Sequence, residues 1–209
     1  MLDYSQELKA WAAELAEFHL PRWEELPTLS LYMDQVVAYI NDTLVFLLAD
    51  PNEQAPKRKR EDRLLTAAMI NNYVKQHFVP KPDKKRYHRE HLACLIVYAL
   101  FKQVLPLTDI QKGVYLQLAL SDNDFQKAYD LFCEQVERAL ASVASVALED
   151  IAEHPQLFAQ QPLTVLGTSM SALALASKIL AQKVLALNTI DGQSDYRVDA
   201  TLAGTNQTQ

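Results

Sequence analysis

The sequence predicts a mainly helical fold, a helical bundle, and three observations support this prediction. The chain of 209 residues contains only four glycines, and 49% of its residues are hydrophobic, which is typical of a globular protein. Apolar residues recur every three to four positions, the period of one face of an α-helix. Pro, Asn and Asp separate these runs, so we expect one helix for each run and few, short strands.

Two helices are expected in residues 1–50. The first covers about residues 3–18, ends before Pro21, and carries an apolar stripe made of Leu8, Trp11, Leu15 and Phe18. A proline-containing connector leads to a second helix over about 31–48, for which Ser30 is a plausible N-cap. Residues 49–62 are polar, with charges in blocks, and are predicted to form a mobile loop.

The middle third predicts a helix, a hairpin and a second helix. The first of these helices starts at Thr66 as N-cap and has an inward face and an outward face. The inward face holds Ile70, Tyr73, Val74 and His77, and the outward faces hold Asn71, Asn72, Lys75 and Gln76. The stretch "VPKPDKKRY" contains two prolines and cannot continue the helix, so it is expected to form a short hairpin.

The remaining runs complete the predicted organisation. A helix over about 89–104 is nearly all apolar and should be the most buried element. A shorter helix, capped by Thr108 and ending near Leu120, follows the break at Pro106. A long helix over about 122–145, an amphipathic helix over about 164–187 and a disordered tail over 188–209 follow. The predicted fold class is therefore a helical bundle containing a central winged helix-turn-helix with a short two-stranded β-wing. Its parts are N-terminal helices in 1–50, the winged module in 51–120, C-terminal helices for dimerisation or an effector in 121–187, and the tail.

Charge is distributed unevenly along the chain. Between Lys57 and His91 there are eleven Lys and Arg against four Asp and Glu, a formal charge of +7, while the remainder carries −13. A solvated surface of mixed charges does not separate the two signs in this way. An acidic body with one basic module suits a protein that contacts a polyanion at one place, and such binding should weaken steeply with salt.

The middle third resembles the MerR family of bacterial transcription regulators. The resemblance runs without a gap through "TAAMINNYVKQHFVPKPDKKRYHREHLACLIVYALFKQVLPLTDI", residues 66–110. Positions that match the family pattern are Thr66, Tyr73, Pro80, Lys85, Arg86, Tyr87, Leu92 and Ile110. His88 replaces the usual Ser cap, Asn71 and Asn72 replace an Arg-aromatic pair, and the turn before the helix is stretched into a long basic loop. Most of residues 20–145 also resemble a bacterial YkrK-like family of unknown function.

The candidate DNA-binding residues follow from the winged-helix interpretation. Asn and Gln can pair with adenine in the major groove, which favours base contact by Asn71, Asn72 and Gln76 and phosphate contact by Lys75. The wing residues Lys84, Lys85 and Arg86, together with Arg89, are expected to hold phosphate. Lys57, Arg58, Lys59 and Arg60 form either an arm along a groove or a soluble loop. For each of these residues the alternative is an ordinary solvated surface, and Tyr73 and Tyr87 are expected to pack rather than to stack on bases.

Other functions find little support in the sequence. We find no nucleophile with a base, no glycine-rich phosphate loop and no HExxH motif, so no enzyme activity, catalytic residue or cofactor is predicted. His77, His88 and His91 are unevenly spaced, and neither Cys94 nor Cys133 belongs to a CxxC pair, so no metal site is predicted and reduced thiols in the cytoplasm are expected. The acidic N-terminus does not resemble a signal peptide, and residues 155–177 are too polar for a membrane span.

The sequence thus predicts a cytoplasmic, MerR-like transcription regulator that binds duplex DNA as a homodimer through residues 122–145. Its small-molecule effector, if one exists, is unknown. The alternative is a protein-protein interaction module that uses the winged helix and the C-terminal helices. A single-stranded RNA binder is a third possibility, disfavoured because the sequence predicts no exposed aromatic platforms.

Overall fold

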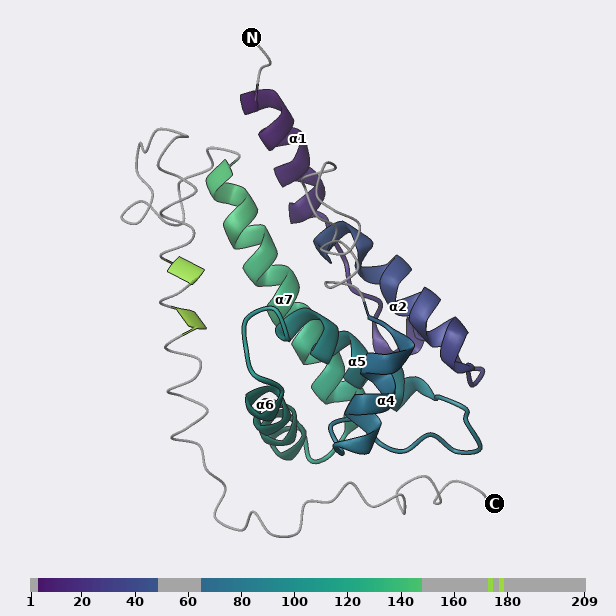
Figure 1. Ribbon diagram of the computed structural model, residues 1–209. Coiled ribbons are helices and arrows are strands. Elements are labelled where there is room, and N and C mark those ends of the chain that lie inside the picture. The colour runs from purple at the N-terminus through teal and green to yellow at the C-terminus, as the bar shows by residue number, and fades with distance from the viewer. Residues whose placement is uncertain (1–3, 49–64, 148–172, 175–176, 179–209) are drawn as a thin grey trace.

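A computed structural model describes residues 4–48, 65–147, 173–174 and 177–178. These residues form a mainly helical fold, which confirms the predicted fold class at that level (Figure 1). The elements in order are α1 (Tyr4–Ala16), a 3₁₀ turn η1 (Trp23–Glu25), α2 (Met33–Leu48), α4 (Ala67–Lys75), α5 (Arg89–Phe101), α6 (Leu107–Leu120) and α7 (Phe125–Ala147). The predicted loop at 49–62 and the tail at 188–209 lie outside the described residues, as does most of the predicted helix at 164–187.

The central helix of the core is α5, as its apolar sequence predicted. Eight of its thirteen residues are buried, running without interruption from His91 to Ile96 and then including Tyr98 and Ala99. Around it pack buried side chains of α2, α4, α6 and α7, such as Ile40, Ile70, Ile110 and Phe132. Each large apolar side chain removed from water in this way contributes about 1.5–3 kcal/mol. One core is therefore shared by residues on both sides of positions 50 and 120.

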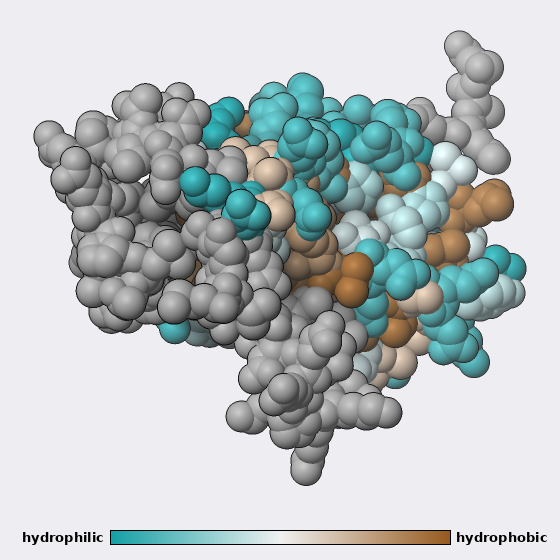
Figure 2. Space-filling model, turned by 90° about the horizontal axis from the view of Figure 1, so that it is seen from above, coloured by the Kyte–Doolittle hydropathy of each residue, from teal (hydrophilic) through white to brown (hydrophobic). Residues whose placement is uncertain are grey.

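A second, smaller apolar cluster joins α1 to the C-terminal half of α7. Ala12 and Leu15 of α1 are buried against Ala144, and Leu140 and Phe46 pack around them. In Figure 1 the two helices run side by side from the body toward the top of the view. Figure 2, which looks down on that end, shows hydrophobic patches among hydrophilic side chains. Large apolar groups stay partly uncovered there, including Trp11 and Val143, which are 46% and 41% exposed.

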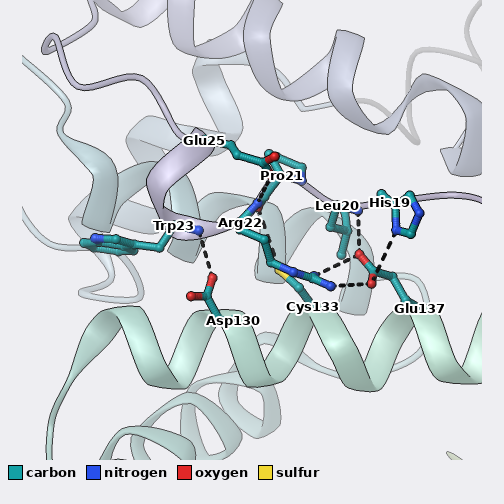
Figure 3. A network of polar contacts seen from close by, with 9 residues as sticks. All are labelled: His19, Leu20, Pro21, Arg22, Trp23, Glu25, Asp130, Cys133 and Glu137. Atoms are coloured by element: carbon teal, nitrogen blue, oxygen red, sulfur yellow. Dashed lines mark hydrogen bonds and ion pairs between the residues drawn. The ribbon is translucent and has the colours of Figure 1, made fainter.

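The connector between α1 and α2 is held on α7 by a network of polar contacts (Figure 3). Arg22 donates through Nη1 and Nη2 to the two carboxylate oxygens of Glu137, a bidentate pair. The backbone N–H of Leu20 also donates to Glu137, over 2.9 Å, and that of Trp23 donates to Asp130, over 2.8 Å. Burial alone would raise the pKa of Glu137, but the donors from Arg22 and Leu20 outweigh it and lower that pKa. These contacts fix the entry to α2.

Three predicted helix ends are wrong. The helix after the connector begins at Met33 rather than near Leu31, and its first turn is capped by Gln35, whose Oε1 accepts the Tyr32 N–H over 2.9 Å, so Ser30 is not its N-cap. Pro106, not Thr108, is the N-cap of α6: its backbone is extended, with ψ 148°, and the helix begins at the next residue, Leu107. His77 does not extend the inward face of α4, which ends at Lys75.

The predicted two-stranded β-wing is also corrected. Residues 79–87 contain isolated bridges, between Asp83 and Arg86 and between Leu31 and Tyr87, and the described residues form no β-strand. Pro80 and Pro82 lack the backbone N–H that a ladder of hydrogen bonds would need. The segment is thus a tight turn that pairs at one point with the start of α2, and not a ribbon of two strands.

Candidate nucleic-acid interface

The helix α4 is attached to the body at its N-terminal end. Thr66 caps it as predicted, because its hydroxyl oxygen accepts the N–H of Met69 over 3.2 Å. The side chain of Asn41 on α2 then holds the preceding residue through two hydrogen bonds. Its Oδ1 accepts the Leu65 N–H over 2.8 Å, and its Nδ2 donates to the Leu65 carbonyl over 2.9 Å. These contacts set the direction in which α4 leaves the body.

The two sides of α4 have opposite characters. Ile70 and Tyr73 face the core and are buried, and the ring of Tyr73 packs on Tyr98 with 5.6 Å between centroids. Burial of Tyr73, and likewise of Tyr87, confirms that both are packing residues. The opposite side consists of the exposed residues Asn71, Asn72, Lys75 and Gln76. Within that set, Gln76 Nε2 donates to Asn72 Oδ1 over 2.9 Å, one helical turn apart.

The end of α4 is closed by a C-cap that normally uses glycine. The N–H of Phe78 donates to the Tyr73 carbonyl over 2.9 Å, and the N–H of His77 donates to the Val74 carbonyl over 3.2 Å, the pattern of a Schellman motif. His77 has φ 61°, in the left-handed region, and its carbonyl accepts a hydrogen bond from Gln111 on α6 over 3.0 Å. A helical period continued past Lys75 therefore misplaces His77, whose side chain is exposed.

The hairpin turn places two lysines at its tip. Lys84 and Lys85 have φ 44° and 64°, and the N–H of Arg86 donates to the Asp83 carbonyl over 2.7 Å. Positive φ at both central residues defines the type I′ hairpin turn, in which Asn-Gly is the favoured pair. Each non-glycine residue in this region costs about 1–2 kcal/mol. Both lysine side chains are exposed, so the turn holds two cations in a strained conformation at the surface.

Arg86 and Tyr87 join this turn to the start of α2. Tyr87 and Leu31 exchange two backbone hydrogen bonds of 2.8 and 2.9 Å. The guanidinium carbon of Arg86 lies 4.1 Å from the centroid of the Tyr32 ring, a cation–π contact, and Nη1 of Arg86 donates to the Ser30 carbonyl over 3.4 Å. Arg86 remains exposed, so its charge is positioned by the turn and still reaches solvent.

Arg89 is used inside the fold. Its Nε donates to the Leu26 carbonyl over 3.1 Å, its Nη1 forms an ion pair with Glu24 at 3.0 Å, and its Nη2 donates to the Glu24 carbonyl over 3.1 Å. Only 19% of its side chain is exposed. A guanidinium with its donors occupied in this way ties α5 to η1, so Arg89 is not part of the exposed surface that carries the other predicted residues.

The structure leaves seven of the predicted DNA-binding residues exposed to solvent. We call the exposed outer side of α4 and the following turn the α4–turn surface; it comprises Asn71, Asn72, Lys75, Gln76, Lys84, Lys85 and Arg86. Lys57, Arg58, Lys59 and Arg60 lie outside the described residues. Pairing of Tyr87 with Leu31 fixes the turn against the body that also carries α4.

Sequence reasoning missed the role of His91, which lies beneath the turn. Its Nδ1 accepts the His88 N–H over 3.0 Å, closing a capping box at the start of α5. Its Nε2 is buried without a hydrogen-bond partner among the described groups. Burial lowers the pKa of His91 and outweighs the opposing effects of the Lys81 backbone and Glu90, while His88 lowers it further. The signal in the sequence was a histidine three residues after the N-cap residue of a helix.

Metal ions, reactive thiols and membrane spans each require a particular arrangement of residues, and the described residues can be compared with each. No group of three or more His, Cys, Asp or Glu side chains in this part of the chain is arranged to hold a metal ion. Cys94 and Cys133 are free and buried, and burial raises the pKa of their thiols to about 12 and about 11. None of the described helices combines the length and apolar character that a membrane span requires.

Fold and surface together define a mainly helical protein that exposes a polar helix and a neighbouring lysine turn. The chain belongs to the family described as Domain of unknown function (DUF1836), whose model matches residues 21–132, more than half of its length. This range includes η1, the α4–turn surface and the first part of α7. No curated protein and no solved structure matches the chain.

Proposed function

We propose that this protein is a DNA-binding transcription regulator, similar in its middle third to MerR regulators, and that it binds duplex DNA through the α4–turn surface. One observation carries the proposal. The helix α4 buries Ile70 and Tyr73 on the body and leaves its amide- and lysine-bearing side exposed, and the turn that follows it in the chain carries the exposed Lys84 and Lys85 at its tip.

The proposed contacts divide into two kinds. Asn71, Asn72 and Gln76 are the base-reading candidates, because a carboxamide can donate to and accept from the adenine edge in the major groove. The hydrogen bond from Gln76 to Asn72 restricts both side chains before DNA arrives, which leaves Asn71 as the first candidate. Lys75, Lys84, Lys85 and Arg86 would contact phosphates, which position the protein without reading sequence.

The proposal includes a homodimer, because one short helix in one groove buries too little surface for specific affinity. The helix α7, predicted for this role, packs against α1 along its C-terminal half. The surface proposed for pairing is therefore the arm made of α1 and the second half of α7, where Trp11 and Val143 are partly exposed. A dimer formed there would carry two α4 helices.

The test is a fluorescence-anisotropy titration with a library of genomic duplex fragments, repeated over a series of salt concentrations. Each phosphate contact contributes a slope of about −0.9 in the plot of log K against log salt. The variant Lys84→Ala/Lys85→Ala should lower affinity for every fragment and reduce the slope by about two contacts. Asn71→Ala should instead reduce the difference in affinity between the best fragment and an unrelated one by about 1–3 kcal/mol.

The matched control removes the same charge elsewhere. Lys112→Ala/Lys127→Ala deletes two lysines on α6 and α7, each paired with the aspartate three residues before it, and should leave the salt slope unchanged. If the two double variants behave alike, the binding is not located on the α4–turn surface. If no duplex binds, the protein-protein interaction module becomes the better interpretation.

A further inference from the structure

A large apolar cavity lies between α5, α6 and α7. Its volume is about 690 Å³, and its wall includes Val97 and Phe101 of α5, Val114 of α6 and Phe132 of α7. Small-molecule sites in proteins have volumes of about 300–1,000 Å³ and mostly apolar walls with a few polar groups. No residue of the α4–turn surface lines the cavity, so it is a separate feature, and a ligand there goes beyond the proposed function.

A glycine in the middle of a helix keeps part of this space open. Gly113 lies at the centre of α6 and lines the cavity, and it is the only glycine among the described residues. Glycine in a helix interior is destabilising relative to alanine. Any larger side chain at this position would project toward the cavity. Gly113 thus weakens α6 at a position where the absence of a side chain enlarges the cavity.

The polar groups at the cavity indicate what kind of ligand fits. Gln117, one turn after Gly113, lines the wall, and its Nε2 is buried without a hydrogen-bond partner in the described part of the chain. An unpaired buried donor is costly and is satisfied by an acceptor. Lys178 adds a positive charge to the wall, and the negative charge of Asp109 is paired with Lys112 at 3.4 Å. The polar groups of the wall that can meet a ligand therefore include the Gln117 amide and the Tyr129 hydroxyl, both buried without a partner in the described part of the chain, and the exposed cation of Lys178.

We propose that this cavity binds an apolar carboxylic acid. The hydrocarbon part lies against α5, α6 and α7, and the carboxylate accepts from Gln117 Nε2 and balances the charge of Lys178. A purely apolar molecule would leave the amide unpaired, and a cationic amphiphile would offer neither an acceptor nor an opposite charge.

Isothermal titration calorimetry on the full chain tests the proposal, with decanoate as the probe below its micelle concentration. Decyltrimethylammonium has the same chain length, a positive head and no acceptor, and should bind at least about tenfold more weakly than decanoate, the loss of a charged hydrogen bond. Gln117→Leu should lower the affinity for decanoate by about tenfold and leave the affinity for decyltrimethylammonium unchanged.

Two substitutions at one position test the location. Gly113→Leu inserts a bulky side chain into the wall one turn before Gln117 and should weaken decanoate binding, while Gly113→Ala should retain it. Both variants should keep or raise the melting temperature, because leucine and alanine are better helix formers than glycine. Unchanged decanoate affinity in folded Gly113→Leu overturns the proposal, as does equal binding of the two amphiphiles. Absence of binding to the unmodified chain also overturns it and assigns the cavity to packing by protein, either a segment of this chain or a second copy. Should Gly113→Leu fail to fold, the Gln117→Leu comparison decides alone.

Discussion

Individual residues of this protein adopt conformations that a sequence pattern does not predict. Lys84, Lys85 and His77 all have positive φ, where glycine or asparagine would be favoured. Backbone strain of this kind collects at functional sites because selection keeps the side chain despite its cost. The two lysines at the tip of the hairpin turn are the clearest instance, since both are exposed and neither stabilises the core.

Removing the strain of the turn should raise the stability of the protein and weaken its DNA binding. Lys84→Asn/Lys85→Gly places the favoured pair in the type I′ turn and should raise the free energy of unfolding by about 1–2 kcal/mol. The same variant should bind duplex DNA more weakly, with a salt slope smaller by about two contacts. Urea unfolding and anisotropy measure the two quantities on one preparation. If the variant is neither more stable nor weaker in DNA binding, the inference that the strained lysines serve binding is wrong.

The buried imidazole of His91 should make stability depend on pH. Burial lowers its pKa below the ordinary value near 6.5, so the unfolded chain binds this proton more readily than the folded one. The free energy of unfolding should therefore be fully retained above about pH 6.5 and fall as the pH drops below it. His91→Gln, whose side-chain oxygen can still accept the His88 N–H, should flatten the profile between pH 7.5 and 5. The matched control is a histidine substitution at an exposed position, His77→Asn, measured over the same pH range.

Helix positions and faces were predictable from the sequence, whereas several helix ends were not. Apolar spacing predicted the two faces of α4 and the burial of α5, because side chains three and four residues apart share one face. The ends depend on single hydrogen bonds, such as the acceptance of the Tyr32 N–H by Gln35, which compete with other plausible caps. The β-wing was overpredicted because prolines mark both edge strands and turns.

The exposure of the candidate surface residues could be predicted only in part from the sequence. The exposure of Asn71 and Lys75 followed from helical period, but the engagement of Arg89 by Glu24 did not, because 65 residues separate them in the chain. The burial of His91 could not be predicted from the sequence either, because the burial that lowers its pKa arises only when other parts of the chain pack around it.

The ion pair of Arg22 with Glu137 is one of several contacts that hold the connector between α1 and α2 on α7. Glu137 has 14% of its side chain exposed and Arg22 has 35%, so water screens the pair only in part. Arg22→Ala and Glu137→Gln should each lower the free energy of unfolding by about 1–3 kcal/mol. The double variant should lose less than the sum of the two, because each single change strands the other partner. Arg22→Lys should restore only part of the loss, since lysine cannot match both carboxylate oxygens. Additive losses in chemical denaturation would contradict this coupling.

The whole chain is acidic, and its positive charge is concentrated between Lys57 and His91. In the proposed function, the way two copies pair would determine how this region meets DNA. If the arm of α1 and α7 pairs two copies, Trp11→Glu/Val143→Glu should convert a dimer to a monomer, because two charges would be buried in an apolar contact. Size-exclusion chromatography with light scattering measures the mass. The control Leu29→Glu changes a side chain that is 80% exposed and lies away from the arm. A monomeric unmodified chain, or a dimer that survives the double change, would exclude this arm as the interface.

The contact of Arg22 with Glu137 spans 115 positions of the chain, and this has a consequence for synthesis on the ribosome. The family match ends at residue 132, so a nascent chain that has just completed that region still lacks the carboxylate on which its connector closes. Domains fold as units while translation proceeds at about 5–20 residues per second. The connector is therefore expected to close fully only after α7 has left the exit tunnel. A fragment cut at the family boundary would keep the contact of Trp23 with Asp130 but lack the pair of Arg22 with Glu137.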